Sequence, residues 1–300
     1  MENIITAIDL GSNSMRVLMF DCISKKTVGE FEKTVGTADK MGENDGNITP
    51  EAQNRIITAL NESIQKLNYE PKEAIAVTTQ AMRIAKNSDE VLNNISKNTG
   101  VCFQIIEGEK EANLTLLAVE YALKRHNLPS QKFIALDIGG GSTELIIVDT
   151  QKRVKSFPYG IVVLAQSDDR AKGLLALENE MSAYLDKLSL DLSSYSFVAT
   201  AGTPTTIAAM MHKQTFATYN KHVVNGTQVS KDDINEVQSY LNNLNEAELE
   251  IKVGTGRTHF IDTGIEIFKL VYSILDKNSA VVFDDGLREG VTIDKCLNFD

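Results

Sequence analysis

The sequence predicts an α/β protein built from two domains. Three observations support this fold class: a length of 300 residues at 42% hydrophobic composition, short apolar runs that alternate with helical patterns, and a strand–turn–strand segment that occurs twice. A chain of this length can bury a sizeable core, and it is typically divided into two domains. Strands that alternate with helices along the chain are typical of α/β architecture.

The strand–turn–strand segment repeats at a constant offset of 128 residues. AIDLGSNSMRVLMFD spans 7–21, and ALDIGGGSTELIIVD spans 135–149. We interpret the two as copies of a duplicated unit, one opening each domain, with chance similarity between two such segments as the alternative. The identical pairs are Ala7 with Ala135, Asp9 with Asp137, Gly11 with Gly139, Ser14 with Ser142 and Asp21 with Asp149.

A polar stretch, RHNLPSQK at 125–132, precedes the second copy and marks the expected domain boundary. We therefore place the first domain over 1–126 and the second over 127–284. The last helical pattern lies within 285–300, and one arrangement has it completing the first domain.

The remaining elements follow from hydrophobic periodicity. Thr49 is the expected N-cap of a helix that has Pro50 in its first position. Apolar runs predict strands over 74–79, 102–106, 197–201 and 280–283. Helical patterns cover 49–67, 108–125, 174–188, 230–244, 260–275 and 286–297.

Charge and composition exclude several classes of function. The net charge of −11 comes without a dense Lys/Arg run, whereas nucleic-acid binders usually carry a basic face. No apolar stretch approaches the roughly 20 residues that span a bilayer, and the N-terminus lacks the regions of a signal peptide. Neither nucleic acid nor a membrane is expected as a partner.

Three cysteines, Cys22, Cys102 and Cys296, lie far apart and in no metal-binding motif. An odd number of widely spaced cysteines favours buried thiols in a reducing compartment, with a reactive or metal-binding thiol as the alternative. Together with the lack of a signal peptide, this pattern predicts a cytoplasmic protein.

Each copy of the repeat ends a buried strand in a turn rich in small residues. Glycine permits positive φ and leaves no Cβ in the way, so such a hairpin can present bare N–H groups to phosphate oxygens. An ordinary tight turn is the alternative. The dinucleotide motif does not fit, because STELIIVD predicts a strand where that motif opens a helix. The candidate phosphate-binding residues are Gly11, Ser12, Asn13 and Ser14 in the first copy, and Gly139, Gly140, Gly141, Ser142 and Thr143 in the second.

In order and spacing, AIDLGSNS, TTQAMR, IIEGEKEA, ALDIGGGSTE, ATAGTPTT and GLREG resemble the exopolyphosphatase/guanosine pentaphosphate phosphohydrolase (Ppx/GppA) family. The resemblance covers essentially the whole chain. It implies two actin-like (ribonuclease H-like) domains with an interdomain cleft, as in the actin-like ATPase superfamily. It also implies that polyphosphate or pppGpp loses its terminal phosphate to water. Because the chain stops at Asp300, it resembles the short, two-domain form of the family.

The resemblance also implies roles for individual residues. Glu111 of the GxxEA element falls on the catalytic glutamate, and Arg83 falls on a phosphate-binding arginine. Asp137 and Glu144 fall on the acids associated with divalent metal. With Asp9, they are the candidate ligands of Mg²⁺, which binds carboxylates together with phosphate oxygens and water.

These assignments have plainer alternatives, and the family motif is not matched throughout. Glu111 could pair only with the helix dipole, and Arg83 could be a surface arginine. The two aspartates could cap turns, and Glu144 could be a solvated strand residue. Lys110 and Asn113 stand where many members have an acid and an arginine, which puts chain-length preference in doubt.

Hydrolysis of a phosphoanhydride requires neutralised phosphate charge, an in-line water and a group that orients the water. The sequence therefore favours a Mg²⁺-dependent exopolyphosphatase. The alternatives are a pppGpp phosphohydrolase, an actin-like kinase or ATPase, and a non-catalytic module that binds polyphosphate or (p)ppGpp. Chain-length preference, metal preference and oligomeric state stay open, with a homodimer as one option.

Overall fold

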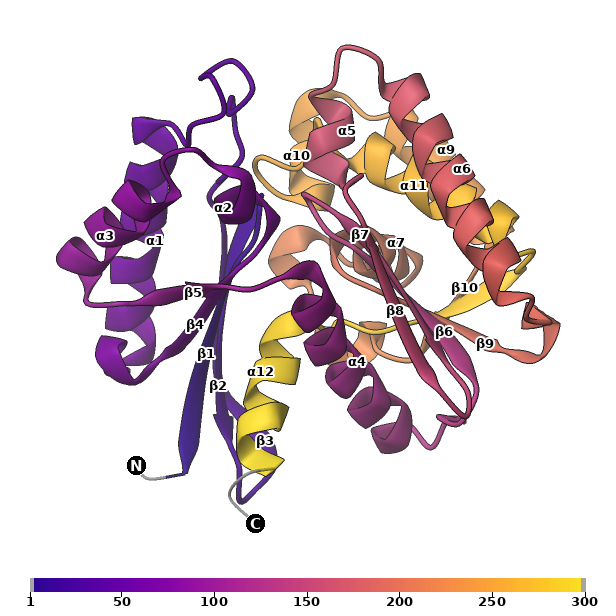
Figure 1. The fold of residues 1–300 in the computed structure, drawn as a ribbon, viewed down its shortest axis with the longest axis horizontal. Coiled ribbons are helices and arrows are strands. Elements are labelled where there is room, and N and C mark those ends of the chain that lie inside the picture. The colour runs from indigo at the N-terminus through magenta and orange to yellow at the C-terminus, as the bar shows by residue number, and fades with distance from the viewer. Residues whose placement is uncertain (1–2, 298–300) are drawn as a thin grey trace. The chain divides into compact units, whose positions relative to one another are not determined.

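The computed structural model describes residues 3–297, which form two compact units. The division runs Met1–Ala118 with Leu287–Asp300, which we call the first unit, and Val119–Gly286, the second unit. The boundary falls within helix α4 (Gly108–Arg125), whereas the boundary expected from the sequence follows residue 126. Each unit contains one sheet, and the two are described separately (Figure 1).

The first unit is built on a five-stranded sheet in the order β3-β2-β1-β4-β5. Neighbours among β1, β2 and β3 are antiparallel, while β4 is parallel to β1 and β5 is parallel to β4. The strands are β1 (Ile4–Leu10), β2 (Ser14–Asp21), β3 (Lys26–Thr34), β4 (Ile75–Thr78) and β5 (Phe103–Ile105).

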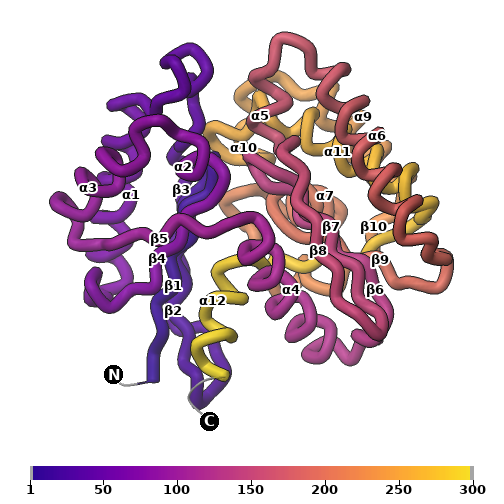
Figure 2. Tube along the Cα trace, in the orientation of Figure 1, coloured from indigo at the N-terminus to yellow at the C-terminus, as the bar shows by residue number. Residues whose placement is uncertain are grey.

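Helices cover both faces of this sheet. Alternate residues of a strand point to opposite faces, so Ile8 packs with α1 (Pro50–Leu67) and α3 (Ser88–Thr99), while Ala7 packs with the other layer. That other layer is the first half of α4 together with α12 (Leu287–Cys296), which contacts β1 and β2 (Figures 1 and 2). The remaining elements of this unit are α2 (Gln80–Ile84) and the 3-10 helix η1 (Pro71–Glu73).

Two expectations about helix ends can be compared directly with this unit. The start of α1 is confirmed, because Pro50 opens the helix and the Thr49 hydroxyl accepts a hydrogen bond of 3.2 Å from the Ala52 amide. The helical pattern expected within 285–300 corresponds to α12, and residues 298–300 lie outside the described part of the chain.

The second unit repeats the start of the first and extends it. Its sheet has the order β10-β11-β9-β6-β7-β8, and its first three strands are again antiparallel neighbours followed by a strand parallel to the first of them. The predicted pair of strand–turn–strand copies is therefore present. The strands are β6 (Phe133–Ile138), β7 (Thr143–Val148), β8 (Lys152–Phe157), β9 (Ser196–Thr200), β10 (Thr227–Ser230) and β11 (Ser279–Val282).

The core of the second unit contains packed aromatic side chains. Phe268 and Tyr272 meet edge to face at 4.9 Å between ring centroids, and the buried Tyr272 hydroxyl donates to the Val229 carbonyl at 2.6 Å.

Within residues 3–297, no helix is both long and apolar enough to cross a membrane. The helices are α5 (Ile161–Ala165), α6 (Arg170–Leu188), α7 (Gly202–Met211), α8 (Lys221–Val224), α9 (Lys231–Asn242), α10 (Glu246–Val253) and α11 (Ile261–Ile274), with 3-10 helices η2 (Leu192–Ser194) and η3 (Phe216–Thr218).

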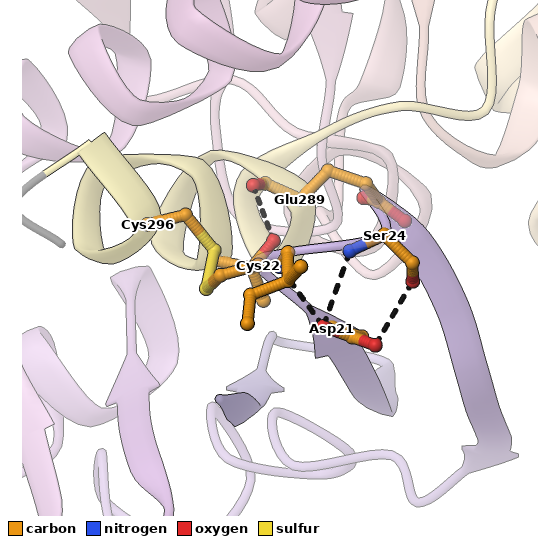
Figure 3. The surroundings of a disulfide bond; sticks show 7 residues. Asp21, Cys22, Ser24, Glu289 and Cys296 are labelled. Atoms are coloured by element: carbon orange, nitrogen blue, oxygen red, sulfur yellow. Dashed lines mark hydrogen bonds between the residues drawn. A yellow bond between two sulfur atoms is a disulfide. The ribbon is translucent and has the colours of Figure 1, made fainter. Parts of the chain in front are cut away.

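The cysteines depart from the sequence-based expectation. Cys22 and Cys296 form a disulfide that joins the end of β2 to the last turn of α12 (Figure 3), and Cys102 is an exposed free thiol. The prediction of three buried thiols is therefore wrong. The two bonded cysteines are separated by 274 positions in sequence and by 5.2 Å between Cα atoms. The two cysteines meet because the C-terminal helix packs on the first sheet. Their spacing in the sequence therefore does not indicate the disulfide.

Candidate active site

The first glycine turn, residues 11–14, joins β1 to β2. It is closed by the Gly11 amide, which donates to the Ser14 carbonyl at 3.0 Å. The carbonyls of Ser12 and Asn13 accept hydrogen bonds of 2.8–2.9 Å from backbone amides within 35–38, the segment after β3. Among the described residues, no hydrogen bond uses the amides of Ser12 and Asn13 as donors.

The second glycine turn, residues 139–143, joins β6 to β7 and is held in the same way. The Gly139 amide donates to the Ser142 carbonyl at 2.9 Å. The carbonyls of 139–141 accept hydrogen bonds of 2.8–3.3 Å from amides within 160–163, where α5 begins. In the part of the chain between residues 3 and 297, the amides of Gly140 and Gly141 donate to no other group.

In both turns, therefore, the carbonyls are bound by the segment that follows the third strand, while the tip amides donate no hydrogen bond within residues 3–297. Ser12 and Gly141 are buried, and Asn13 and Gly140 are partly exposed. Successive bare amides of this kind form concave sites for anions such as phosphate.

Thr143, a predicted phosphate-binding residue, has its hydroxyl bound to the protein backbone instead. The Thr143 hydroxyl, fully buried, donates to the Tyr159 carbonyl at 2.7 Å, so it serves the scaffold of the turn.

The strand positions beside the two turns carry different charges. In the first unit, Asp9 faces Arg16 across β1 and β2, and Arg16 in turn lies 3.5 Å from the carboxylate of Glu32 on β3. In the second unit, Asp137 faces Glu144 across β6 and β7. Like charges directly opposite each other on a sheet repel. In the first unit the residue opposite the aspartate is an arginine, and in the second unit it is a glutamate.

The carboxylate pair of the second unit fits a hard divalent cation. Glu144 is only 1% exposed, and it accepts a hydrogen bond of 2.7 Å from the Ser156 hydroxyl, so it is not a solvated strand residue. One or two carboxylates completed by phosphate oxygens and water are typical ligands of Mg²⁺. Across residues 3–297, no group of three or more His, Cys, Asp and Glu side chains is arranged to hold a metal. The expected third ligand, Asp9, belongs to the first unit and faces Arg16.

The ends of the parallel strands of the first unit are tied together next to its glycine turn. The Thr78 hydroxyl at the end of β4 donates to the Leu10 carbonyl at 2.8 Å, and the Ile106 amide after β5 donates to the Thr78 carbonyl at 3.0 Å. The carboxyl ends of parallel strands are where α/β sheets hold their ligands. Two residues past Ile106 the chain enters α4, so the first helical turn of α4 is fixed at this edge.

Glu111 lies in that first helical turn, close to Arg83 from α2. One Arg83 nitrogen, Nη1, donates to the Ile106 carbonyl and lies 3.9 Å from the Glu111 carboxylate, while Nη2 donates to Gln80 at 2.8 Å. The two side chains are 16% and 14% exposed, so Arg83 is not a surface arginine. Its guanidinium is already bound by protein groups, which makes it a residue that holds the α4 entrance and the Glu111 carboxylate in place.

Two features of the site were missed from the sequence. The offset of 128 aligns Arg16 with Glu144, so the change of charge beside the turns could have been read from the repeat. The second feature is Ala201, which follows the β9 residue paired with Asp137 and has φ 75° and ψ −173°. Non-glycine residues rarely adopt this conformation, and they do so mainly at functional sites. No residue pattern signals it.

The Ppx/GppA phosphatase family model matches residues 21–299. This chain belongs to the Ppx/GppA phosphatase family. The crystal structure of the Aquifex aeolicus member has a TM-score of 0.75 at 27% identity and covers 99% of this chain and 98% of that one. The predicted family and α/β fold are thereby confirmed.

Two curated relatives carry names for different activities within Ppx/GppA. A Mycobacterium leprae protein named exopolyphosphatase 1 is 34% identical over 158 residues, which is 51% of this chain and 46% of that protein. A Vibrio atlanticus protein named guanosine-5'-triphosphate,3'-diphosphate pyrophosphatase is 26% identical over 98% of this chain and 59% of that protein. The matches thus span about half the length of these relatives.

The two departures from the Ppx/GppA motif lie on the outer side of α4. Lys110 and Asn113 are both exposed, and the Asn113 amide donates to the Glu109 carbonyl at 2.8 Å. The Asn113 side chain therefore forms a hydrogen bond with the backbone of its own helix. The neighbouring Glu111 keeps the half-buried position described above, so these substitutions leave its surroundings in place.

Proposed function

We propose that this chain is a phosphoanhydride hydrolase that removes the terminal phosphate from inorganic polyphosphate. The observation that carries the proposal is the pair of glycine turns, whose carbonyls accept hydrogen bonds from the segments after the third strands and whose tip amides donate none within residues 3–297. Membership of the Ppx/GppA phosphatase family supports the same reaction class.

The proposed roles follow from the surroundings of each group. The tip amides of the two glycine turns bind phosphoryl oxygens. Glu111 orients the attacking water and accepts its proton, and such general-base help is typically worth about 10² to 10⁴ in rate. Arg83 positions Glu111 from a distance of 3.9 Å.

Asp137 and Glu144 are the residues that would hold Mg²⁺, because they face each other beside the second glycine turn. Mg²⁺ bound there would supply charge neutralisation for phosphate oxygens. Asp9 has a guanidinium opposite it and is assigned to the scaffold of the first turn.

The test is a phosphate-release assay with long-chain polyphosphate, pppGpp and ATP, each with and without Mg²⁺. Glu111→Gln is expected to lower kcat by about 10² to 10⁴ because it removes the proton acceptor. The fold should persist, since Arg83 keeps its hydrogen bonds to Ile106 and Gln80. Glu109→Gln is the matched control, since Glu109 lies in the same helical turn but is exposed. Full activity of Glu111→Gln would remove Glu111 from the mechanism.

A second candidate substrate is pppGpp. The observation that favours it is the Vibrio atlanticus relative, whose similarity extends over 98% of this chain. Comparison of kcat/KM for polyphosphate and pppGpp decides between them. ATP-dependent phosphorylation of a sugar would instead indicate a kinase, and tight binding without turnover would indicate a binding module.

A further inference from the structure

The C-terminal helix α12 is in backbone contact with the helix that carries Glu111. A Cβ at Gly290 would lie 1.9 Å from the carbonyl oxygen of Leu114 and 2.4 Å from its carbonyl carbon, a gap that only glycine fits. Leu114 lies one helical turn beyond Glu111. Leu287 and Val291 of α12 pack in the same cluster as Leu114. In addition to the contacts of Ile106 and Arg83 at the start of α4, α12 therefore packs directly against the helical turn that follows Glu111.

The docking of α12 also buries charge. Arg288 and Glu289 are both buried, and the Arg288 Nε donates to the Glu289 carboxylate at 2.8 Å. Removing an ion pair from water costs free energy that mutual attraction often fails to recover. The apolar contacts of Leu287 and Val291 favour docking against this cost, and a covalent constraint on the helix would add to them.

The Cys22–Cys296 disulfide is that constraint. Cys22 follows β2 and is fixed on the sheet side, because its amide donates to the Asn3 carbonyl at 3.0 Å and the adjoining turn is held by Asp21. The Asp21 carboxylate accepts hydrogen bonds from the Ile23 amide at 2.9 Å and from the Ser24 hydroxyl at 2.9 Å (Figure 3). One end of the bond is thus anchored in the sheet, and the other holds the last turn of α12.

We propose that this disulfide is a redox-sensitive switch that controls the position of Glu111 through α12 and α4. With the bond formed, α12 is held against Leu114 and the helical turn of Glu111 is fixed. With the bond reduced, α12 loosens and turnover falls. The effect on turnover rests on the proposed function, whereas the effect on helix order does not.

The reductant is a dithiol, and the exchange is balanced. One of its thiolates attacks a sulfur of the Cys22–Cys296 bond, which forms a mixed disulfide and releases the other cysteine as a thiolate that takes up a proton. The second thiol of the reductant then displaces the remaining cysteine and becomes part of the oxidised reductant. Both cysteines are buried, so attack requires the last turn of α12 to open locally.

The experiment compares untreated and dithiothreitol-treated protein by hydrogen–deuterium exchange and by phosphate release. Mass spectrometry of alkylated protein should count one free thiol before reduction and three after it. Reduction should raise exchange in peptides from α12 and from the first helical turn of α4. It should lower kcat by about 10- to 100-fold, the loss expected from a displacement of roughly 1 Å at a catalytic group.

Three variants make the result specific. The double variant Cys22→Ala/Cys296→Ala should behave like the reduced protein and give no response to dithiothreitol. Cys102→Ser, which removes the exposed thiol, should respond like the wild type. Gly290→Ala should raise exchange in the first helical turn of α4 without any change in redox state.

The proposal is overturned if reduction raises exchange in α12 and leaves the first helical turn of α4 unchanged, or if Cys102→Ser abolishes the response. It is also overturned if alkylation counts three free thiols before reduction. Absence of phosphate release in every redox state would contradict the proposed function, while the exchange data would still decide whether the disulfide controls α4.

Discussion

Arg16 and Glu144 occupy the same position in the two copies of the repeat, and they give the neighbouring aspartates opposite surroundings. Asp9 faces a guanidinium, and Asp137 faces a buried carboxylate. Like charges at facing strand positions repel each other. One position of the repeat thus places side chains of opposite charge opposite the two aspartates.

The first prediction concerns this carboxylate pair. Glu144→Gln should leave the metal-free protein at least as stable as the wild type, because it removes a like charge facing Asp137 while the Ser156 hydrogen bond can persist. Mg²⁺ should stabilise the wild type by about 2.7 kcal/mol at roughly 100 times its Kd and should have no such effect on the variant. Thermal unfolding with increasing Mg²⁺ measures both effects.

Glu32→Gln is the control for this experiment, because Glu32 pairs with Arg16 in the other unit. Its response to Mg²⁺ should match that of the wild type. An undiminished Mg²⁺ response of Glu144→Gln would show that the metal binds elsewhere.

At the scale of elements, the glycine turns depend on segments that show little signal in the sequence. The turns themselves were predicted, because glycines between two apolar runs are a strong local pattern. The third strands, β3 and β8, were not, because KTVGEFEKT and KRVKSF are edge strands with few buried residues. The segments that follow these strands donate hydrogen bonds to the carbonyls of both turns. Because the strands were not predicted, these hydrogen bonds were not predicted either.

Gly160 is the position where this support can be tested. A Cβ there would lie 2.3–2.4 Å from backbone atoms of Gly140, Gly141 and Ser142, so Gly160→Ala must displace the second glycine turn. We expect a loss of about 1–3 kcal/mol in the free energy of unfolding, as for overpacking in a core, and weaker binding of tripolyphosphate. Urea unfolding and calorimetric titration measure the two effects.

Gly42→Ala is the matched substitution, because a Cβ at Gly42 meets no atom within 4 Å. It should change neither the stability nor the binding of tripolyphosphate by more than a small amount. Tripolyphosphate affinity that survives in Gly160→Ala would separate phosphate binding from the shape of the second turn.

Over the whole molecule, sequence reasoning reached the family, the α/β fold and the duplicated hairpins, because each rests on local patterns such as GGG between strands and the helix at Thr49. It failed where residues distant in sequence meet. One expected arrangement has the C-terminal helix completing the first domain, and α12 does belong to the first unit. The contacts that it makes there, the Cys22–Cys296 bond and the approach of Gly290 to Leu114, leave no local pattern in the sequence. The surroundings of Arg83 depend on the same kind of tertiary contact.

The most direct test of the central claim is to follow the backbone amides of the two glycine turns during titration with tripolyphosphate and Mg²⁺, by two-dimensional NMR of ¹⁵N-labelled protein. We expect the amide signals of Ser12 and Asn13 in the first unit and of Gly140 and Gly141 in the second to shift in a saturable way, while the signal of Gly42 stays in place. Saturable tripolyphosphate binding that leaves all four of these signals unmoved would contradict it.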